Sequence, residues 1–193
     1  IDDIITLDPG EAFEFSGVEV GANVYDKLIG VDLTKGNALV GELAQSWTVS
    51  PDNLTYTFKL RPGVKFHSGN PLTAADVVYS IQRAVTLNKS PGFILTQFGF
   101  SKDNVLETVK ALDDLTVQMK VAKPYAPTFF LNCLTSGVAG IVDSKLVKAN
   151  EKDGDFGNGW LKLNSAGSGA YSVRAYRPGE QYTLEANANW YKG

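Results

Sequence analysis

The sequence contains few of the residues that metal, redox and covalent sites require. Its 193 residues include one cysteine, Cys133, and one histidine, His67. A single cysteine excludes a disulfide within the chain, and a single histidine excludes a metal site built from several histidines. Cys133 lies in an apolar stretch and is interpreted as a small buried side chain. We expect no metal site and no cofactor, and no residue is named as catalytic.

An excess of positive charge and a long hydrophobic run are also lacking. The net charge is −3 at pH 7, so the composition indicates no nucleic-acid partner. No apolar stretch reaches the roughly 20 residues that span a bilayer. The sequence opens without a charged leader and apolar core, so we expect either a chain that is never exported or a leader absent from this sequence. Hydrophobic residues make up 44% and charged residues 20%, which is typical of a globular domain.

Apolar periodicity predicts a mixed α+β fold with several hairpins. Apolar and polar residues alternate from Leu54 to Arg61, as in a half-buried strand. The turn Ser50–Asn53 separates this strand from Trp47–Val49 and predicts a hairpin. Two further hairpins are expected within residues 105–122 and 171–186.

The clearest predicted helix follows a capping pattern. Thr73 stands where an N-cap is expected, and Asp76 follows three residues later as in a capping box. Residues 150–169 are rich in Gly, Asn, Asp and Ser and predict a loop. Helices are expected over residues 18–28, 72–87 and 128–134.

One long block carries a resemblance to a known family. The block from Leu43 to about Arg83 resembles the signature of the bacterial extracellular solute-binding proteins of family 5, the dipeptide-, oligopeptide- and nickel-binding proteins of ABC importers. Further blocks agree in order with the same family: Leu7-Asp-Pro, Asn23-Val-Tyr-Asp-Lys-Leu, Lys123-Pro-Tyr-Ala-Pro, Gly167-Ser-Gly-Ala-Tyr and Asn187-Ala-Asn-Trp-Tyr.

The resemblance implies the first lobe of a two-lobe periplasmic-binding-protein type II fold, which closes around a solute by hinge motion. Residues 1–45 and 160–193 are expected to form part of the base of this lobe. Residues 46–159 are expected to form an inserted α+β subdomain. Because family members are much longer, the chain is interpreted as an N-terminal fragment with a truncated base and no second lobe.

The resemblance also suggests which loops face the ligand. The matching N-terminal loop of the family lies by the ligand cleft, although Phe13 or Phe15 packing in the core is an open alternative. Gly137 and its neighbours occupy a region where nickel-binding members place an arginine, which argues against a nickel chelate. The candidate ligand-binding residues are Phe13, Glu14, Phe15, Ser16, Gln97, Phe98, Thr135, Ser136, Gly137 and Ser168.

The function implied by the resemblance is capture and delivery of a solute. The chain is expected to be a monomeric, periplasmic or lipid-anchored component of an ABC importer that passes peptides, or a related small solute, to membrane permease subunits. One wall of a cleft buries little ligand surface, so this piece alone is expected to bind weakly. Two alternatives stay open: a hydrolase on a similar scaffold, and a ligand-sensing domain of a regulator.

Overall fold

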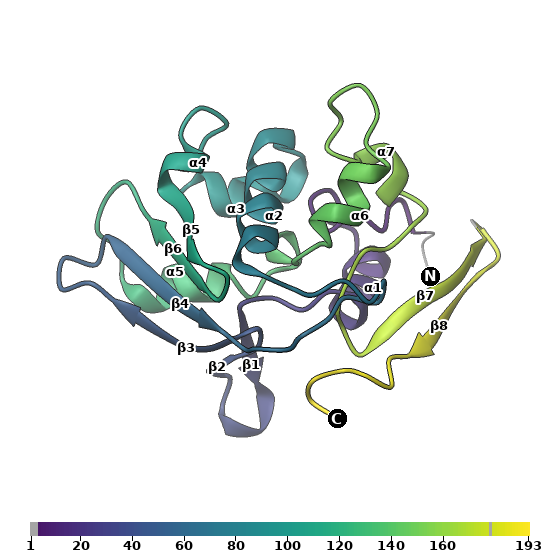
Figure 1. Cartoon of the computed structure of the whole chain (residues 1–193), viewed down its shortest axis with the longest axis horizontal. Helices are drawn as coiled ribbons and strands as arrows, with labels where there is room; N and C mark the ends of the chain where they lie inside the picture. Colours follow the sequence, from purple (N-terminus) through teal and green to yellow (C-terminus); the bar gives the residue numbers. More distant parts are fainter. Residues whose placement is uncertain (1–3, 178) are drawn as a thin grey trace.

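The structure is a computed structural model that describes residues 4–177 and 179–193. They form a four-stranded sheet, two two-stranded hairpins and short helices (Figure 1). The elements follow the order α1 (Phe15–Val24), β1 (Ile29–Asp32), η1 (Leu33–Lys35), β2 (Ala38–Gly41), β3 (Ala44–Val49), β4 (Thr55–Leu60), α2 (Ala74–Leu87), η2 (Ser90–Gly92), α3 (Phe93–Thr96), α4 (Val105–Thr108), β5 (Val109–Asp113), β6 (Thr116–Lys120), α5 (Pro127–Cys133), η3 (Gly137–Ala139), α6 (Ser144–Ala149), α7 (Asn158–Leu161), β7 (Tyr171–Arg177) and β8 (Gln181–Ala186).

The four-stranded sheet is antiparallel, with strand order β3-β4-β6-β5. Tyr56 of β4 pairs with Met119 of β6, and Phe58 pairs with Val117. All four side chains are fully buried, because alternate residues of a strand face the same side of a sheet. The alternation of apolar and polar residues from Leu54 to Arg61 therefore reflects a strand with one buried face, as the sequence predicted.

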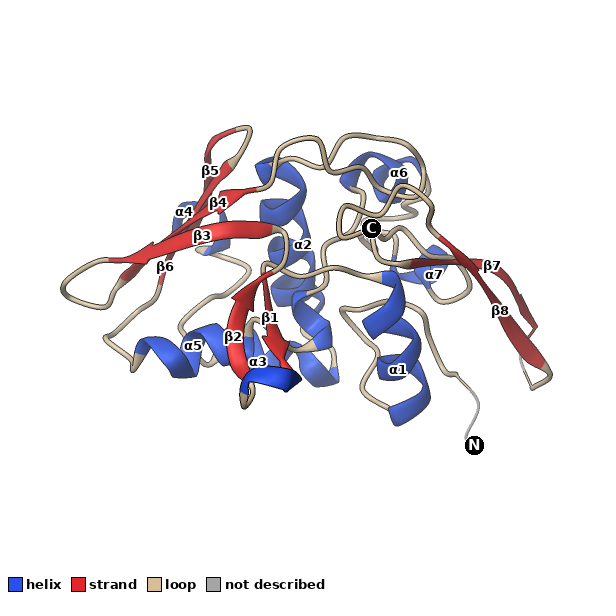
Figure 2. Ribbon diagram, turned by 90° about the horizontal axis from the view of Figure 1, so that it is seen from below, coloured by secondary structure: helices blue, strands red, loops and turns tan. Residues whose placement is uncertain are grey.

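Helix α2 crosses the centre of the molecule, between the sheet at one end and the β7–β8 hairpin at the other (Figures 1 and 2). Its predicted capping box is confirmed: the Thr73 main-chain N–H donates to Asp76 Oδ2 at 2.8 Å. The other Asp76 oxygen accepts from the Ser144 hydroxyl at 2.6 Å. The cap thus also fixes the start of α6 against the start of α2.

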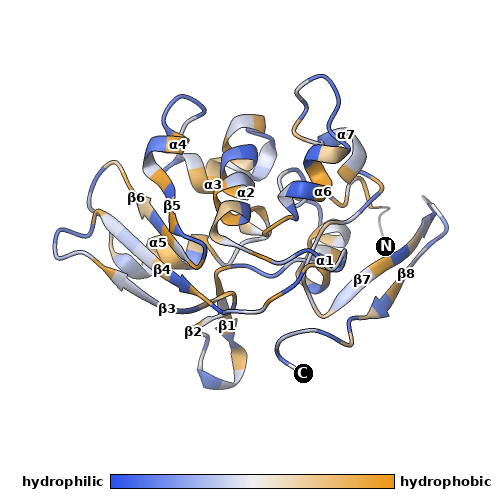
Figure 3. Cartoon of the chain, in the orientation of Figure 1, coloured by the Kyte–Doolittle hydropathy of each residue, from blue (hydrophilic) through white to orange (hydrophobic). Residues whose placement is uncertain are grey.

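Two hydrophobic clusters make up the core of the described residues. The larger cluster joins the sheet to α2, α3 and α5, and hydrophobic segments gather there, whereas the β3–β4 turn is hydrophilic (Figure 3). The smaller cluster joins residues near the N-terminus and α1 to residues 142–166, and partly buried residues of β7 and β8 pack against it. Residues 142–161 therefore pack with both ends of the described chain. The predicted division at residues 45 and 159 stays a prediction.

The turn after β4 serves as an architectural connector. The His67 main-chain N–H donates to the Gly167 carbonyl at 2.9 Å, and the His67 Nε2 lies 2.9 Å from the Gly169 carbonyl. Asp143 accepts from the Ser68 hydroxyl at 2.5 Å and from the Asn70 amide at 2.8 Å. These side-chain bonds connect residues that lie 73 to 102 positions apart, so the turn that contains His67 holds distant segments together.

The mixed α+β class and the three hairpins are confirmed, and two local predictions are wrong. The first helix begins at Phe15 and ends at Val24, because Tyr25 is extended and carries its side chain into the core. The expected loop at 150–169 contains the short helix α7. In the described part of the chain, no helix is long and apolar enough to cross a membrane.

Candidate ligand-binding site

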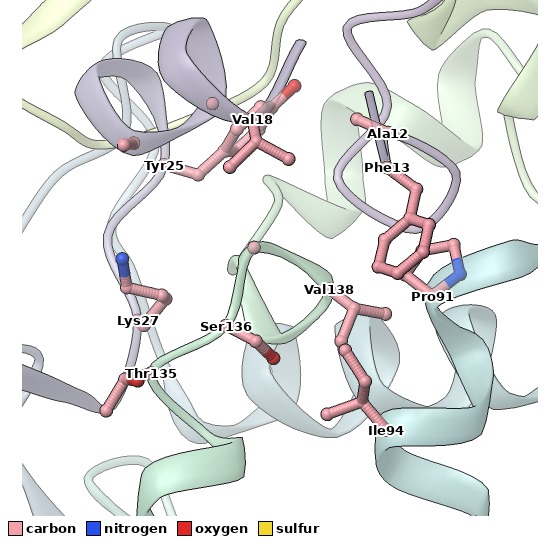
Figure 4. A pocket seen from close by; sticks show the side chains of 13 residues that line it. Ala12, Phe13, Val18, Tyr25, Lys27, Pro91, Ile94, Thr135, Ser136 and Val138 are labelled. Atoms are coloured by element: carbon pink, nitrogen blue, oxygen red, sulfur yellow. The ribbon is translucent and has the colours of Figure 1, made fainter. Parts of the chain in front are cut away.

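A pocket of about 280 Å³ lies beside α1. The loop before α1, the segment 91–94 and the segment 135–138 complete its walls. Lys27, Thr135 and Ser136 lie on one side of this pocket, and Phe13, Pro91 and Ile94 lie on the opposite side (Figure 4). The fold thus brings together segments that are more than a hundred positions apart in the sequence.

One wall of the pocket is apolar and ends in exposed aromatic rings. Phe13 is 54% exposed, and the neighbouring Phe93 is 56% exposed. Their ring centroids lie 6.1 Å apart with an interplanar angle of 89°, an edge-to-face contact. Exposed aromatic side chains beside a concavity are typical of binding sites, because their burial by a ligand is favourable. This wall is therefore suited to an apolar group.

The opposite wall carries the polar groups. The Thr135 hydroxyl donates to the Asn132 carbonyl at 2.8 Å, and the Ser136 hydroxyl donates to the Cys133 carbonyl at 2.6 Å. Both hydroxyl protons are therefore used at the end of α5, and their lone pairs are left as acceptors. The half-buried Lys27 also lines this wall, and no described residue forms an ion pair or side-chain hydrogen bond with its ammonium group.

The loop before α1 is shaped by Glu14. One Glu14 carboxylate oxygen accepts from the Ile5 N–H at 3.2 Å, and the other accepts from the Phe13 N–H at 3.1 Å. A Cβ atom at Gly17 would lie 2.2 Å from Glu14 Oε1, so a larger residue at this position would displace the carboxylate from its hydrogen bonds. Glu14 therefore positions the Phe13 main chain through its hydrogen bonds and does not line the pocket.

Four of the predicted residues line this pocket, namely Phe13, Thr135, Ser136 and Gly137. Phe15 is 86% exposed but lies outside the lining. The alternative that Phe13 or Phe15 packs in the core is wrong for both rings, which are exposed. Gln97 is exposed near the pocket, and its amide donates to the Ile94 carbonyl at 2.9 Å.

Three other predicted residues are buried. Phe98 is fully buried, and the centroid of its ring lies 4.8 Å from the centroid of the Phe130 ring. Ser16 is also buried, at the start of α1. The buried Ser168 hydroxyl donates to Asp26 Oδ2 at 2.9 Å. Burial of these three side chains does not favour contact with a ligand in this conformation, so their role in binding stays a prediction.

The glycines around Ser168 are explained by close packing. A Cβ atom at Gly167 would lie 1.9 Å from the Val24 carbonyl oxygen, and one at Gly169 would lie 2.5 Å from the Asn23 carbonyl oxygen. The segment therefore packs its backbone directly against the end of α1. A side chain at either position would therefore collide with the main chain of α1.

Lys27 and Ile94 were missed as candidates because the sequence offers no direct signal for them. Lys27 lies within the Asn23–Leu28 block, whose neighbours Val24, Tyr25 and Leu28 are core residues. Lys27 follows the buried Asp26, and the indirect signal is that its charged side chain must reach the surface or a pocket. Among the described residues, no group of three or more His, Cys, Asp or Glu side chains is placed to hold a metal ion.

The chain is similar in sequence to bacterial solute-binding proteins. The family model for bacterial extracellular solute-binding proteins, family 5 (middle), matches residues 38–193. The chain is 32% identical over 188 residues to the probable D,D-dipeptide-binding periplasmic protein DdpA of Escherichia coli K12, covering 96% of this chain and 34% of that protein. It is 30% identical over 187 residues to the glutathione-binding protein GsiB of Pectobacterium atrosepticum, covering 97% and 33%. The chain thus spans about a third of the length of these relatives.

Solved structures show the same fold. The Escherichia coli murein tripeptide binding protein MppA matches with a TM-score of 0.81 and 25% identity, over 99% of this chain and 38% of that chain. MoaA from Agrobacterium tumefaciens R10, in complex with mannopinic acid, matches with a TM-score of 0.79 and 29% identity, over 99% and 36%. Both matches support the predicted fold class.

Proposed function

Because the chain belongs to the bacterial extracellular solute-binding proteins of family 5, we propose that it forms the first lobe of an importer's solute receptor. The receptor captures a small solute outside the cytoplasm, in the periplasm or anchored to the cell surface, and peptides are the solute class that we favour. Dipeptide and glutathione binding are named for its relatives, and mannopinic acid is bound by a structural neighbour.

The observation that carries this proposal is the pocket beside α1. Four predicted ligand-binding residues from two distant segments meet there, next to exposed aromatic rings. The pocket is open and belongs to a single wall, so a second wall from the rest of the protein would complete the burial of a solute. Closure would then be favoured by the ligand through its higher affinity for the closed form.

The lobe would keep the predicted division, with one adjustment. Residues 1–45 and 160–193 form part of the base, and the sheet with α2 forms the inserted subdomain. The smaller hydrophobic cluster supports assigning residues 142–159 to the base as well, because Val142 and Val147 pack with Leu7, Val20 and Leu161.

Capture and delivery require no bond to be broken, so we propose a transport role without catalysis. The closed, loaded receptor would dock on the permease subunits of an ABC importer as a monomer. A hydrolase centred on His67 has no support, because this ring lies in a turn with Nε2 against the Gly169 carbonyl.

The proposal is tested by calorimetry on the full-length protein with a library of short peptides. We expect at least one peptide to bind with a micromolar or lower Kd, and the 193-residue chain alone to bind it far more weakly. A full-length protein that binds no peptide, or that releases amino acids from one, would contradict the proposed function.

A further inference from the structure

One charged side chain, Lys27, contributes to the lining of the pocket beside α1. Building on the proposed function, we propose that Lys27 selects solutes with a carboxylate, and that the Phe13 side of the pocket holds the apolar side chain next to this carboxylate. The solute class is therefore an anionic peptide, or a peptide-like acid, with an apolar residue beside its negative charge.

The electrostatic surroundings of Lys27 favour an anion from outside the lobe. The Lys27 main-chain N–H donates to Glu42 Oε2 at 3.1 Å, which fixes the backbone. This carboxylate contacts the main chain of Lys27 and not its amine, and its other oxygen lies 3.5 Å from Lys192 Nζ. Within the described chain, no acidic side chain neutralises the Lys27 amine.

The residues around Lys27 leave it as the group that would attract an anion. Thr135 and Ser136 each donate their hydroxyl proton to a carbonyl, so neither hydroxyl is set to donate to a carboxylate. Other lining residues, such as Val18 and Ile94, are apolar. An ion pair in such partly desolvated surroundings is stronger than one on an open surface.

The pocket has room for part of a solute. Its volume of about 280 Å³ suits one side chain, and the rest of the solute would be covered by the second wall. Phe13, Ile94 and Val138 form the apolar side, opposite Lys27 and Thr135 (Figure 4). A bound apolar side chain would lie against the first group, and the carboxylate beside it would lie toward Lys27.

The carboxylate could be the carboxyl terminus of a peptide or the side chain of an acidic residue. Two pairs of peptide probes distinguish these two sources. The first pair ends in phenylalanine with either a free carboxylate or an amide. The second pair has an amide at its end and carries either glutamate or glutamine next to phenylalanine. Each probe is titrated by calorimetry into the full-length protein and into the variants Lys27→Met, Lys27→Arg and Lys102→Met. Lys102 is an exposed lysine outside the pocket and is the matched charge control.

We expect Lys27→Met to weaken binding of the carboxylate member of at least one pair about ten-fold, and to leave the neutral member unchanged. Lys27→Arg should restore part of the loss, and Lys102→Met should change neither member. Equal effects of Lys27→Met on both members of each pair, or no effect, would overturn the inference and leave the proposed function intact. A full-length protein that binds no peptide would instead contradict the proposed function.

Discussion

Asp8 and Arg83 form a buried ion pair with two parallel hydrogen bonds. Arg83 Nη1 lies 2.6 Å from Asp8 Oδ1, Nη2 lies 2.7 Å from Oδ2, and both side chains are almost fully excluded from solvent. Asp8 also accepts from the Asn158 amide at 2.7 Å, and Arg83 Nε donates to the Phe156 carbonyl at 3.1 Å. The pair therefore ties the segment before α1 to α2 and to the loop that leads into α7.

Removing one partner of this pair should strongly destabilise the fold. In Arg83→Met, the Asp8 carboxylate stays buried and loses its countercharge, which typically costs about 3–5 kcal/mol. Urea unfolding followed by circular dichroism gives the free energy of unfolding. The exposed pair Lys35–Asp32 is the control, since Lys35 is 72% exposed and Lys35→Met should change stability by less than about 1 kcal/mol. Equal small losses in both variants would contradict a structural role for the buried pair.

Asp143 should contribute to stability through hydrogen bonds to its own helix start and to the distant turn at Ser68 and Asn70. Its carboxylate accepts from Ser68, Asn70 and the Leu146 N–H, so Asp143→Ala leaves these donors without their acceptor. We expect a loss of about 2–4 kcal/mol in the free energy of unfolding, as expected for several bonds to one charged acceptor. Ser68→Ala removes one donor and should cost clearly less. A smaller loss in Asp143→Ala than in Ser68→Ala would show that the turn is not held by this carboxylate.

The sequence predicted the parts of the fold that local patterns determine. The β3–β4 hairpin follows from the alternation around Tyr56, and the start of α2 follows from Thr73 and Asp76, which lie three positions apart. Neither the Asp8–Arg83 pair nor the bond from Ser168 to Asp26 has such a pattern. Their partners lie 75 and 142 positions apart, so only the tertiary fold brings them together.

The candidate site was predicted in part for the same reason. The exposed loop around Phe13 and the turn at Thr135 were found through the family resemblance, and both line the pocket. Phe98 lies next to the exposed Gln97, but its side chain points into the core, because the short helix α3 ends there and Phe130 packs against the ring. Adjacency in sequence therefore did not predict which of the two side chains faces solvent.

Acid pH should destabilise the fold through His67. Burial lowers the pKa of His67 below its ordinary value of 6.5, although its contact with the Gly169 carbonyl acts in the opposite direction. The unfolded chain then binds more protons than the folded chain between the two pKa values, so stability falls as pH decreases from about 7 through this window. His67→Gln keeps a donor for Gly169 and does not titrate. Its free energy of unfolding, measured by urea titration from pH 8 to 5, should fall less than that of the unchanged protein; an equal fall would exclude His67 as the cause.

Truncation of Phe13 should weaken binding without loss of fold stability. The ring is 54% exposed and lines the pocket, so Phe13→Ala removes apolar surface that a bound side chain would cover, at a cost of about 1–2 kcal/mol in binding free energy. Leu33→Ala is the matched control, because Leu33 is 79% exposed in the β1–β2 connection and outside the pocket lining. Calorimetry on the full-length protein should show weaker binding of peptides with a large apolar residue for Phe13→Ala alone, and melting temperatures should stay close to that of the unchanged protein. If both variants bind such peptides as well as the unchanged protein does, Phe13 is not part of the binding surface, and the pocket beside α1 loses its apolar wall as a recognition element.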